Sequence, residues 1–168
     1  SKGEHDYDCP DLAVECALKN MEQGFTALKF DPAGPYSAYS GHQISLKTLA
    51  RSEDFCRKIR AAVGNHCDLL FGTHGQMTPA SAIRLAQRLE PYDPLWFEEP
   101  VPPGQAEAMA QVAAKTSIPI ATGERLTTKY EFHDVLKHQA ASILQMNLGR
   151  VGGILEAKKI AALAEVYY

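Results

Sequence analysis

Two glutamates with a regular spacing are the residues of this chain best placed to do chemistry. Glu98 follows the apolar run 95–97, and Glu124 lies 26 residues later, just beyond the apolar run 118–121. A third polar run begins at Gly72, 26 residues before Glu98. One strand and its helical crossover in a parallel sheet need about that many residues, so the three strand ends should meet at one edge. Two carboxylates placed in this way indicate a site for a divalent cation.

Composition limits the class of protein. The chain has 168 residues, 45% of them hydrophobic, and a formal net charge of −3. We expect a single domain over residues 1–168 with a substantial core. The weakly acidic balance predicts no nucleic-acid partner. The apolar runs are too short to cross a bilayer, so we expect no membrane partner either.

The cysteines carry no motif. Cys9, Cys16, Cys56 and Cys67 form no CxxC pair, and the N-terminal residues do not have the shape of a signal peptide. We therefore expect reduced thiols and a cytoplasmic location.

Short apolar runs alternate with helical patterns along the chain. Strands are expected at 25–30, 68–72, 95–97, 118–121 and 143–147. A helical stripe precedes the first strand and follows each of the five. Thr78 before Pro79, and Thr128 three residues before Glu131, have the form of helix N-caps. The resulting order, α(βα)₅, predicts a parallel sheet covered by helices.

An open, doubly wound sheet and a closed barrel share this alternation. A nucleotide-binding sheet would carry a glycine-rich phosphate loop after its first strand, but here that strand ends in Lys29, Phe30 and Asp31. Every strand ends near an ionisable or amide-bearing residue, as on the C-terminal face of a barrel. We therefore expect an α/β fold that forms part of a (β/α) TIM-type barrel. The Pro- and Tyr-rich loop 31–41 is either a solvated loop or a substrate lid that includes Tyr36.

Five short motifs together resemble the barrel of the enolase superfamily. They are Lys29-Phe-Asp, Gly72-Thr-His-Gly-Gln, Phe97-Glu-Glu-Pro, Gly123-Glu-Arg and Gly152-Gly-Ile. The resemblance covers residues 10–168 and is greatest to the mandelate racemase branch and its acid-sugar dehydratases. It implies abstraction of the proton α to a carboxylate, with Mg²⁺ stabilising the enediolate, followed in dehydratases by loss of the β-hydroxyl.

The resemblance also implies roles for individual residues. Glu98 and Glu124 would be metal ligands, and Lys29 lies on the strand that supplies a basic group. His74 would be the general acid for the leaving hydroxyl, and Asn147 would replace the aspartate that orients a catalytic histidine.

Further contacts are expected around these groups. Tyr36, Gln76 and Arg125 are candidates for substrate binding, with a small sugar acid as the ligand. We expect a homo-oligomer, because relatives commonly form symmetric assemblies.

Plainer roles remain open for the same residues. Glu98 and Glu124 would serve structure alone if they pair with Lys29 or Arg125. We expect Glu99 to form a salt bridge or to support a metal ligand, and not to bind a metal itself. His74 would then be a hydrogen-bonded core histidine.

The chain departs from the family pattern at two positions of the site. Gly72 stands where the family has its first metal-binding aspartate, and Asn147 brings an amide where the family has a carboxylate. Relative to the family, the small capping domain and the first and last barrel strands are also missing. We expect that the chain is part of a longer protein; the alternative is a half-barrel that pairs to close its edges.

The preferred function is thus a Mg²⁺-dependent lyase of the acid-sugar dehydratase type with an altered metal site. A racemase or cycloisomerase that uses the same enolate is the first alternative. A metal-free, non-catalytic relative is the second.

Overall fold

The computed structural model describes residues 9–34 and 43–167. The helices are α1 (Pro10–Glu22), α2 (Leu46–Val63), α3 (Pro79–Leu89), α4 (Ala106–Ala113), α5 (Lys129–Lys137) and α6 (Ile154–Ala164). The strands are β1 (Ala27–Phe30), β2 (Asp68–Gly72), β3 (Trp96–Glu98), β4 (Ile120–Thr122) and β5 (Ile143–Leu144). Short 3₁₀ turns η2 (Gly64–His66) and η3 (Glu90–Tyr92) follow α2 and α3. Tyr36 lies outside the described residues, so its expected contact with substrate stays a prediction.

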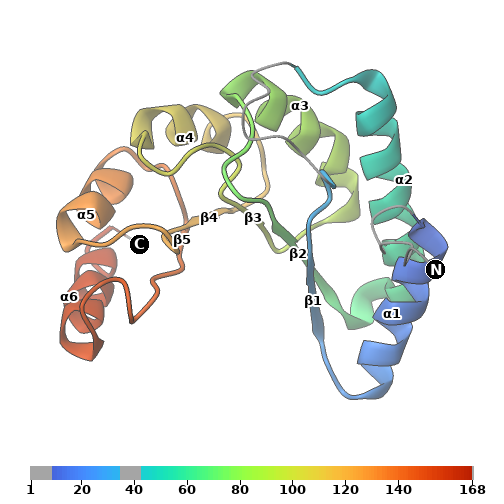
Figure 1. Cartoon of the computed structure of the whole chain (residues 1–168), viewed down its shortest axis with the longest axis horizontal. Coiled ribbons are helices and arrows are strands. Elements are labelled where there is room, and N and C mark those ends of the chain that lie inside the picture. Colours follow the sequence, from blue (N-terminus) through green and yellow to red (C-terminus); the bar gives the residue numbers. More distant parts are fainter. Residues whose placement is uncertain (1–8, 35–42, 168) are drawn as a thin grey trace, which may run out of the picture.

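The five strands form one parallel sheet in which spatial order follows chain order, β1-β2-β3-β4-β5. In a doubly wound sheet the strand order reverses at a switch point, whereas the order in this sheet does not. Right-handed crossovers between strands that follow one another in space place α2, α3, α4 and α5 on the same face of the sheet. Figure 1 shows the result, an arc with the strands along its inner side and the helices along its outer side. This confirms the expected α/β fold and agrees with part of a TIM-type barrel.

Side chains at the helix starts explain why several helices begin where they do. The Thr78 hydroxyl accepts a hydrogen bond from the Ser81 N–H at the start of α3. Thr128 and Glu131 form the expected capping box at the start of α5. Ser45 caps α2 by accepting from the Thr48 N–H. Each cap satisfies a backbone donor that the helix leaves free, a contribution of about 1 kcal/mol.

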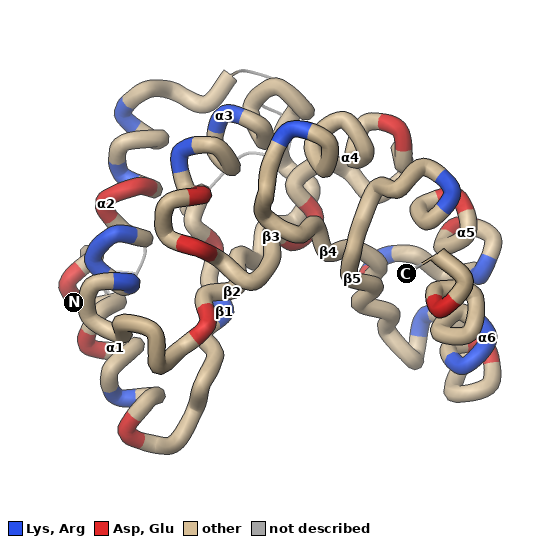
Figure 2. Tube along the Cα trace, turned by 180° about the vertical axis from the view of Figure 1, so that it is seen from behind, with Lys and Arg blue, Asp and Glu red and all other residues tan. Residues whose placement is uncertain are grey.

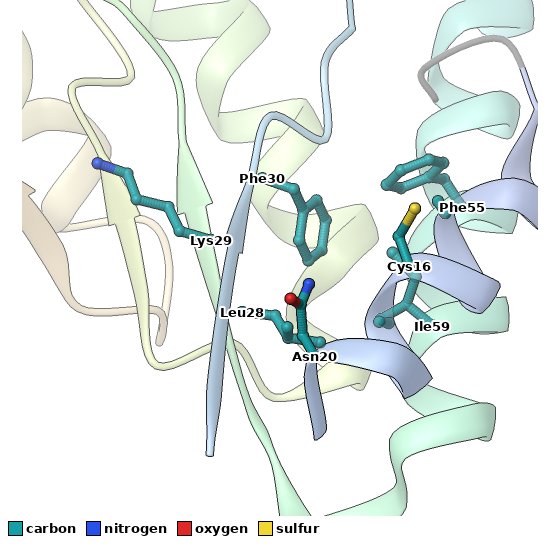
Figure 3. Close-up of a pocket in the computed structure, with 9 residues that line it drawn as sticks. Cys16, Asn20, Leu28, Lys29, Phe30, Phe55 and Ile59 are labelled. Atoms are coloured by element: carbon teal, nitrogen blue, oxygen red, sulfur yellow. The ribbon is translucent and has the colours of Figure 1, made fainter. Parts of the chain in front are cut away.

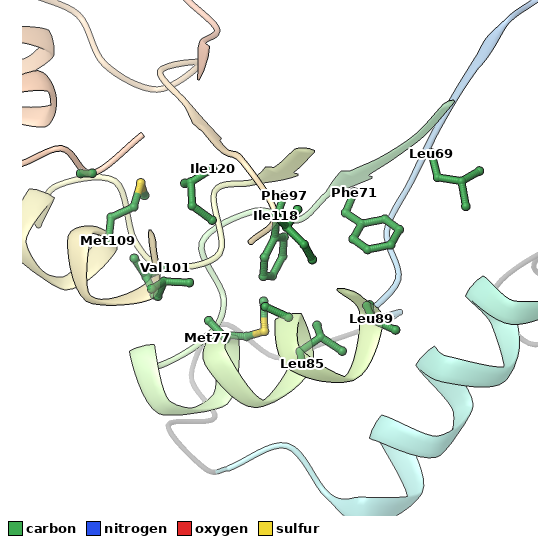
Figure 4. Close-up of a cluster of buried hydrophobic side chains, with 14 of the residues drawn as sticks. Leu69, Phe71, Met77, Leu85, Leu89, Phe97, Val101, Met109, Ile118 and Ile120 are labelled. Atoms are coloured by element: carbon green, nitrogen blue, oxygen red, sulfur yellow. The ribbon is translucent and has the colours of Figure 1, made fainter. Parts of the chain in front are cut away.

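The hydrophobic core lies between the sheet and the helices. Phe30, Phe71 and Phe97 come from three neighbouring strands, and their rings meet edge-on with centroids 5.5 and 6.5 Å apart. In Figure 4 the side chains of β2, β3 and β4 face those of α3 and α4, among them Leu85 and Met109. The outward-facing residues of the strands are therefore apolar. Their neighbours along each strand point to the inner side of the arc.

The last strand differs from the expectation for 143–147. β5 ends at Leu144, although the Gln145 N–H still donates to the Thr122 carbonyl at 2.8 Å. Asn147 then begins a turn, because its side-chain oxygen accepts from the N–H groups of Gly149 and Arg150. An asparagine that bonds its own following backbone competes with strand pairing, so the predicted end of this strand was wrong.

The surface is mixed in charge. Acidic and basic residues are interspersed along the outer helices in Figure 2. All four cysteines are free. In the part of the chain that the structure describes, no helix is long and apolar enough to cross a membrane.

Candidate active site

The C-terminal ends of β1, β2 and β3 bring a row of polar groups to the inner side of the arc. Gly72 is the register partner of Glu98, so the two residues face the same side of the sheet. Lys29 is among the residues that border a hollow with Leu28 and Phe55, but its side chain leaves β1 on the side opposite to that of Phe30 (Figure 3). That hollow lies between β1 and helices α1 and α2, behind the sheet. The polar row is therefore the candidate site.

Glu98 is the centre of the row. Its side chain is only 4% exposed, and its Oε2 lies 2.5 Å from the Lys29 Nζ, whose side chain is 49% exposed. The Gln145 amide also faces this carboxylate. In the orientation that satisfies the hydrogen bonds, its nitrogen donates to Oε1 and Oε2 of Glu98 at 3.0 and 3.2 Å. A buried carboxylate is thus stabilised by an ammonium on one side and an amide on the other.

Gly72 determines where the lysine lies. A Cβ at this position would be 2.5 Å from Cε of Lys29 and 3.3 Å from its Cγ. Gly72 is not among the glycines with positive φ, so it is not required for an unusual backbone conformation. The missing side chain leaves space, since the Lys29 stem lies where a Cβ on Gly72 would be.

His74 lies two residues beyond the end of β2, and its side chain is 59% exposed. Its Nδ1 is 3.9 Å from Oδ2 of Asp31, the residue that follows β1. Asp31 also accepts from the Ala33 N–H at 2.8 Å and from the Gln76 amide at 3.4 Å. Burial raises the pKa of the Asp31 carboxyl above its ordinary value, although these hydrogen bonds and His74 act to lower it.

Gln76 and Arg125 fix the backbone around this histidine. The Gln76 side-chain oxygen accepts from the His74 N–H at 2.7 Å. Arg125 donates to the His74 carbonyl at 3.0 Å and pairs with Glu99, Nη2 to Oε2, at 2.7 Å. The expected ion pair of Glu99 is thereby confirmed. Substrate binding by Gln76 and Arg125 stays a prediction, and both side chains already hold the strand-end loops in place.

In the described part of the chain, neither of the other two expected residues forms a hydrogen bond or ion pair with Lys29 or Glu98. Glu124 follows Gly123 beyond β4, is half-buried, and within residues 9–34 and 43–167 its carboxylate makes no hydrogen bond or ion pair. Asn147 is exposed and closes the turn described above. Their expected roles as metal ligand and catalytic residue stay predictions.

A three-carboxylate site for Mg²⁺ does not fit this arrangement. Mg²⁺ prefers octahedral oxygen coordination, whereas Glu98 already faces an ammonium and two N–H donations from an amide. Gly72 offers no carboxylate, and the space beside it holds the Lys29 stem. Across the described ranges, no group of three or more His, Cys, Asp or Glu side chains is arranged to hold a metal ion.

Two residues of the site escaped the sequence analysis. Asp31 directly follows an apolar strand, the same signal that singled out Glu98, and it belongs to the Lys29-Phe-Asp motif, but it was given no role in the site. Gln145 lies in the last strand run, two residues from Asn147, and period-2 alternation gives both the same face. They differ only because β5 ends at Leu144: Gln145 still faces Glu98, whereas the Asn147 side chain closes a turn.

A curved parallel sheet whose spatial strand order follows the chain, with polar strand ends on its inner side, is typical of α/β-barrel enzymes. Residues 12–168 match the family described as enolase C-terminal domain-like, and the chain belongs to this family.

Relatives with known names support the same assignment. The chain is 44% identical over 164 residues to D-galactonate dehydratase of Xanthomonas euvesicatoria pv. vesicatoria, covering 95% of this chain and 41% of the relative. It is 35% identical over 163 residues to D-xylonate dehydratase of Haloferax volcanii, covering 95% and 40%.

Solved structures agree. A Burkholderia SAR-1 protein assigned to the mandelate racemase/muconate lactonizing enzymes is 74% identical, with a TM-score of 0.95 over 100% of this chain and 42% of that one. A mandelate racemase/muconate lactonizing enzyme-like protein from Roseovarius sp. TM1035 is 60% identical, with a TM-score of 0.92 over 96% and 41%. The chain thus spans about two fifths of the length of these relatives.

Proposed function

We propose that this chain forms part of the active site of a hydro-lyase that dehydrates a hydroxylated carboxylic acid of the sugar-acid class. The observation that carries the proposal is the row of a cation, Lys29, and a candidate acid, His74, on neighbouring strand ends of the inner face. The relatives named above as D-galactonate and D-xylonate dehydratases supply the substrate class.

The chemistry needs a cation, a base and an acid. A general base takes the α-proton, and the electron pair left on carbon forms an enolate, whose negative charge the Lys29 ammonium would offset. As the β carbon–oxygen bond breaks, His74 would donate a proton, so that the hydroxyl leaves as water. The resulting enol tautomerises to a 2-keto-3-deoxy acid. Asp31 lies beside His74 and would position its ring, while Asn147 stays a weaker candidate for the same site.

Magnesium dependence is a separate question. The resemblance to the superfamily implies Mg²⁺, with Glu98 and Glu124 as its ligands. The donors around Glu98 do not fit that role, and no step above passes through a metal.

The experiment is a screen of sugar acids for release of a 2-keto-3-deoxy acid, in the presence of Mg²⁺ and in the presence of a chelator. We expect one acid to be turned over, and His74→Asn to lower the rate by about 100-fold or more, the usual size of a general-acid effect. Lys58→Met removes a lysine that pairs with Asp11 on the surface and is the matched control. Equal rates for His74→Asn and the control would contradict the assignment of His74.

A racemase or cycloisomerase would give a different outcome. The substrate would be recovered with solvent deuterium at the α carbon, and no keto acid would form.

A non-catalytic binding protein is the second candidate function. It is supported by the donors on Glu98, because a carboxylate that already accepts from Lys29 and Gln145 is not free to act as a base or a metal ligand. This candidate predicts binding of a sugar acid without turnover, and the same binding constant after Glu98→Gln.

A further inference from the structure

Lys29 occupies space that an ordinary side chain on β2 would need. The contacts that a Cβ at Gly72 would make are with Cε, Cγ and Cδ of Lys29, at 2.5, 3.3 and 3.5 Å. The stem therefore lies across Gly72 on the neighbouring strand, although about half of the Lys29 side chain is exposed. Because a long lysine stem loses rotamer freedom when it is held in this way, something must stabilise the position.

Glu98 supplies that stabilisation. It is 3% exposed as a residue, and a buried carboxylate without a partner would be costly. Lys29 brings a full positive charge to one oxygen, and Gln145 brings N–H donors to both. The carboxylate is satisfied by groups of this chain alone.

The geometry points to Lys29 as the resident cation of this site: its ammonium takes the place of a divalent metal on Glu98, and the absence of a side chain at Gly72 makes this possible. The Lys29 side chain is about half exposed. The class of ligand that it would bind is an anion, in the first place a carboxylate. The inference concerns which cation Glu98 binds and does not depend on the proposed reaction.

The test is a Mn²⁺ titration followed by electron paramagnetic resonance on the full protein and its variants, since Mn²⁺ accepts the oxygen ligands that Mg²⁺ accepts. Lys29→Met with Gly72→Asp replaces the ammonium by a neutral stem and adds a carboxylate beside Glu98. We expect this double variant to bind Mn²⁺ at least about tenfold more tightly than the wild type. The gain in Mn²⁺ affinity should vanish when Glu98→Gln is added to the double variant. Lys58→Met alone should not raise the Mn²⁺ affinity.

The wild-type protein gives the decisive comparison. We expect its Mn²⁺ signal to be the same as that of Glu98→Gln over the range in which the double variant saturates. Saturable binding in the wild type that Glu98→Gln abolishes would overturn the inference, because Glu98 would then hold a metal in spite of Lys29.

A second measurement stays informative if the double variant does not fold. The ¹³Cε resonance of Lys29, assigned through Lys29→Met, is followed during a MgCl₂ titration against NaCl of equal ionic strength. We expect the same small drift in both salts, and a shift of this resonance after Glu98→Gln. A saturable shift with MgCl₂ alone would show that metal displaces the ammonium and would overturn the inference. Neither readout uses turnover, so failure of the proposed dehydration leaves the result intact.

Discussion

Glu98 and Glu99 are neighbours in the chain with opposite surroundings. Glu98 ends β3, faces the inner side of the arc and pairs with a lysine that is 49% exposed. Glu99 is fully buried, and its backbone has a φ of +40°, which is uncommon for a residue other than glycine. Its carboxylate pairs with Arg125 through Oε2, while Oε1 has no hydrogen-bond partner.

The difference separates a glutamate that faces the candidate ligand site from one that stabilises the structure. The Glu98 region is open enough for its cation to contact a ligand. The Glu99 region holds loops together: the Glu99 carbonyl accepts from the Gly75 N–H and from the Thr73 hydroxyl, at 2.7 and 3.0 Å. Burial raises the pKa of Glu99 above its usual value, Arg125 acts to lower it, and the nearby charges of Glu124 and Glu98 raise it further. The two glutamate side chains thus have different roles, because β3 ends at Glu98 and Glu99 lies just beyond it.

The largest effect on stability is expected at the buried pair. Arg125→Met leaves the Glu99 carboxylate without its ion-pair partner, and we expect a loss of about 2–3 kcal/mol in the free energy of unfolding, toward the low end for buried pairs because Arg125 is 38% exposed. Urea denaturation measures it. Arg88→Met, which removes a surface pair with Glu53, is the control and should cost less than about 1 kcal/mol. Equal losses would mean that burial of Glu99 does not matter.

The pH dependence of stability should carry the signature of Glu99. Because its folded-state pKa is raised, the stability that Glu99 contributes is fully present below its unfolded pKa and is lost as pH rises through the folded value. The unfolding free energy of Glu99→Gln minus that of the wild type should therefore increase from about pH 4.5 upward.

Glu90 provides the opposite control. Hydrogen bonds from the Ser117 N–H and the Thr116 hydroxyl hold its pKa below the usual range. Its contribution is present above the unfolded pKa and is lost as pH falls, so the same difference for Glu90→Gln should decrease as pH rises. Slopes of the same sign in the two variants would contradict the contrast.

Glu98→Gln should change stability little, by less than about 1 kcal/mol, because its partner is half exposed and an amide oxygen still accepts from Lys29. If the protein is the proposed lyase, Glu98→Gln should also lower the turnover rate at least about tenfold, because it changes the charge around Lys29. Denaturation and keto-acid release measure the two effects. A large loss of stability with unchanged turnover would show that Glu98, like Glu99, has a structural role.

The smallest effect on stability is expected for Gly72→Ala, a change within about 0.5 kcal/mol, since the neighbour that must move is a flexible lysine. The ¹³Cε resonance of Lys29 should nevertheless shift. Gly123→Ala is the contrasting control, because Gly123 has a φ of +131° and a Cβ there would lie 2.7 Å from the Phe132 ring. It should cost more than about 1 kcal/mol. A larger loss at Gly72 than at Gly123 would contradict the explanation of Gly72 as space for Lys29.

Much of the architecture is determined locally and could be predicted from the sequence. The alternation of apolar runs and helical stripes, with caps such as Ser45 and Thr128, depends on residues close in the chain. The regular distance from Gly72 to Glu98 to Glu124 follows from the length of one βα unit. The inner-facing strand ends could therefore be identified without coordinates.

The pairing of the site residues was decided by tertiary structure. Lys29, Gly72, Glu98 and Gln145 come from four different strand ends, and their contacts depend on a register and on side-chain paths that no local pattern encodes. Asn147 and Gln145 are equivalent by alternation, and only the turn that captures the Asn147 side chain separates them. The sequence by itself determined which groups lie on the inner edge of the sheet. Only packing across the strands decided that the cation on Glu98 is a lysine, because a glycine on the neighbouring strand leaves room for its stem.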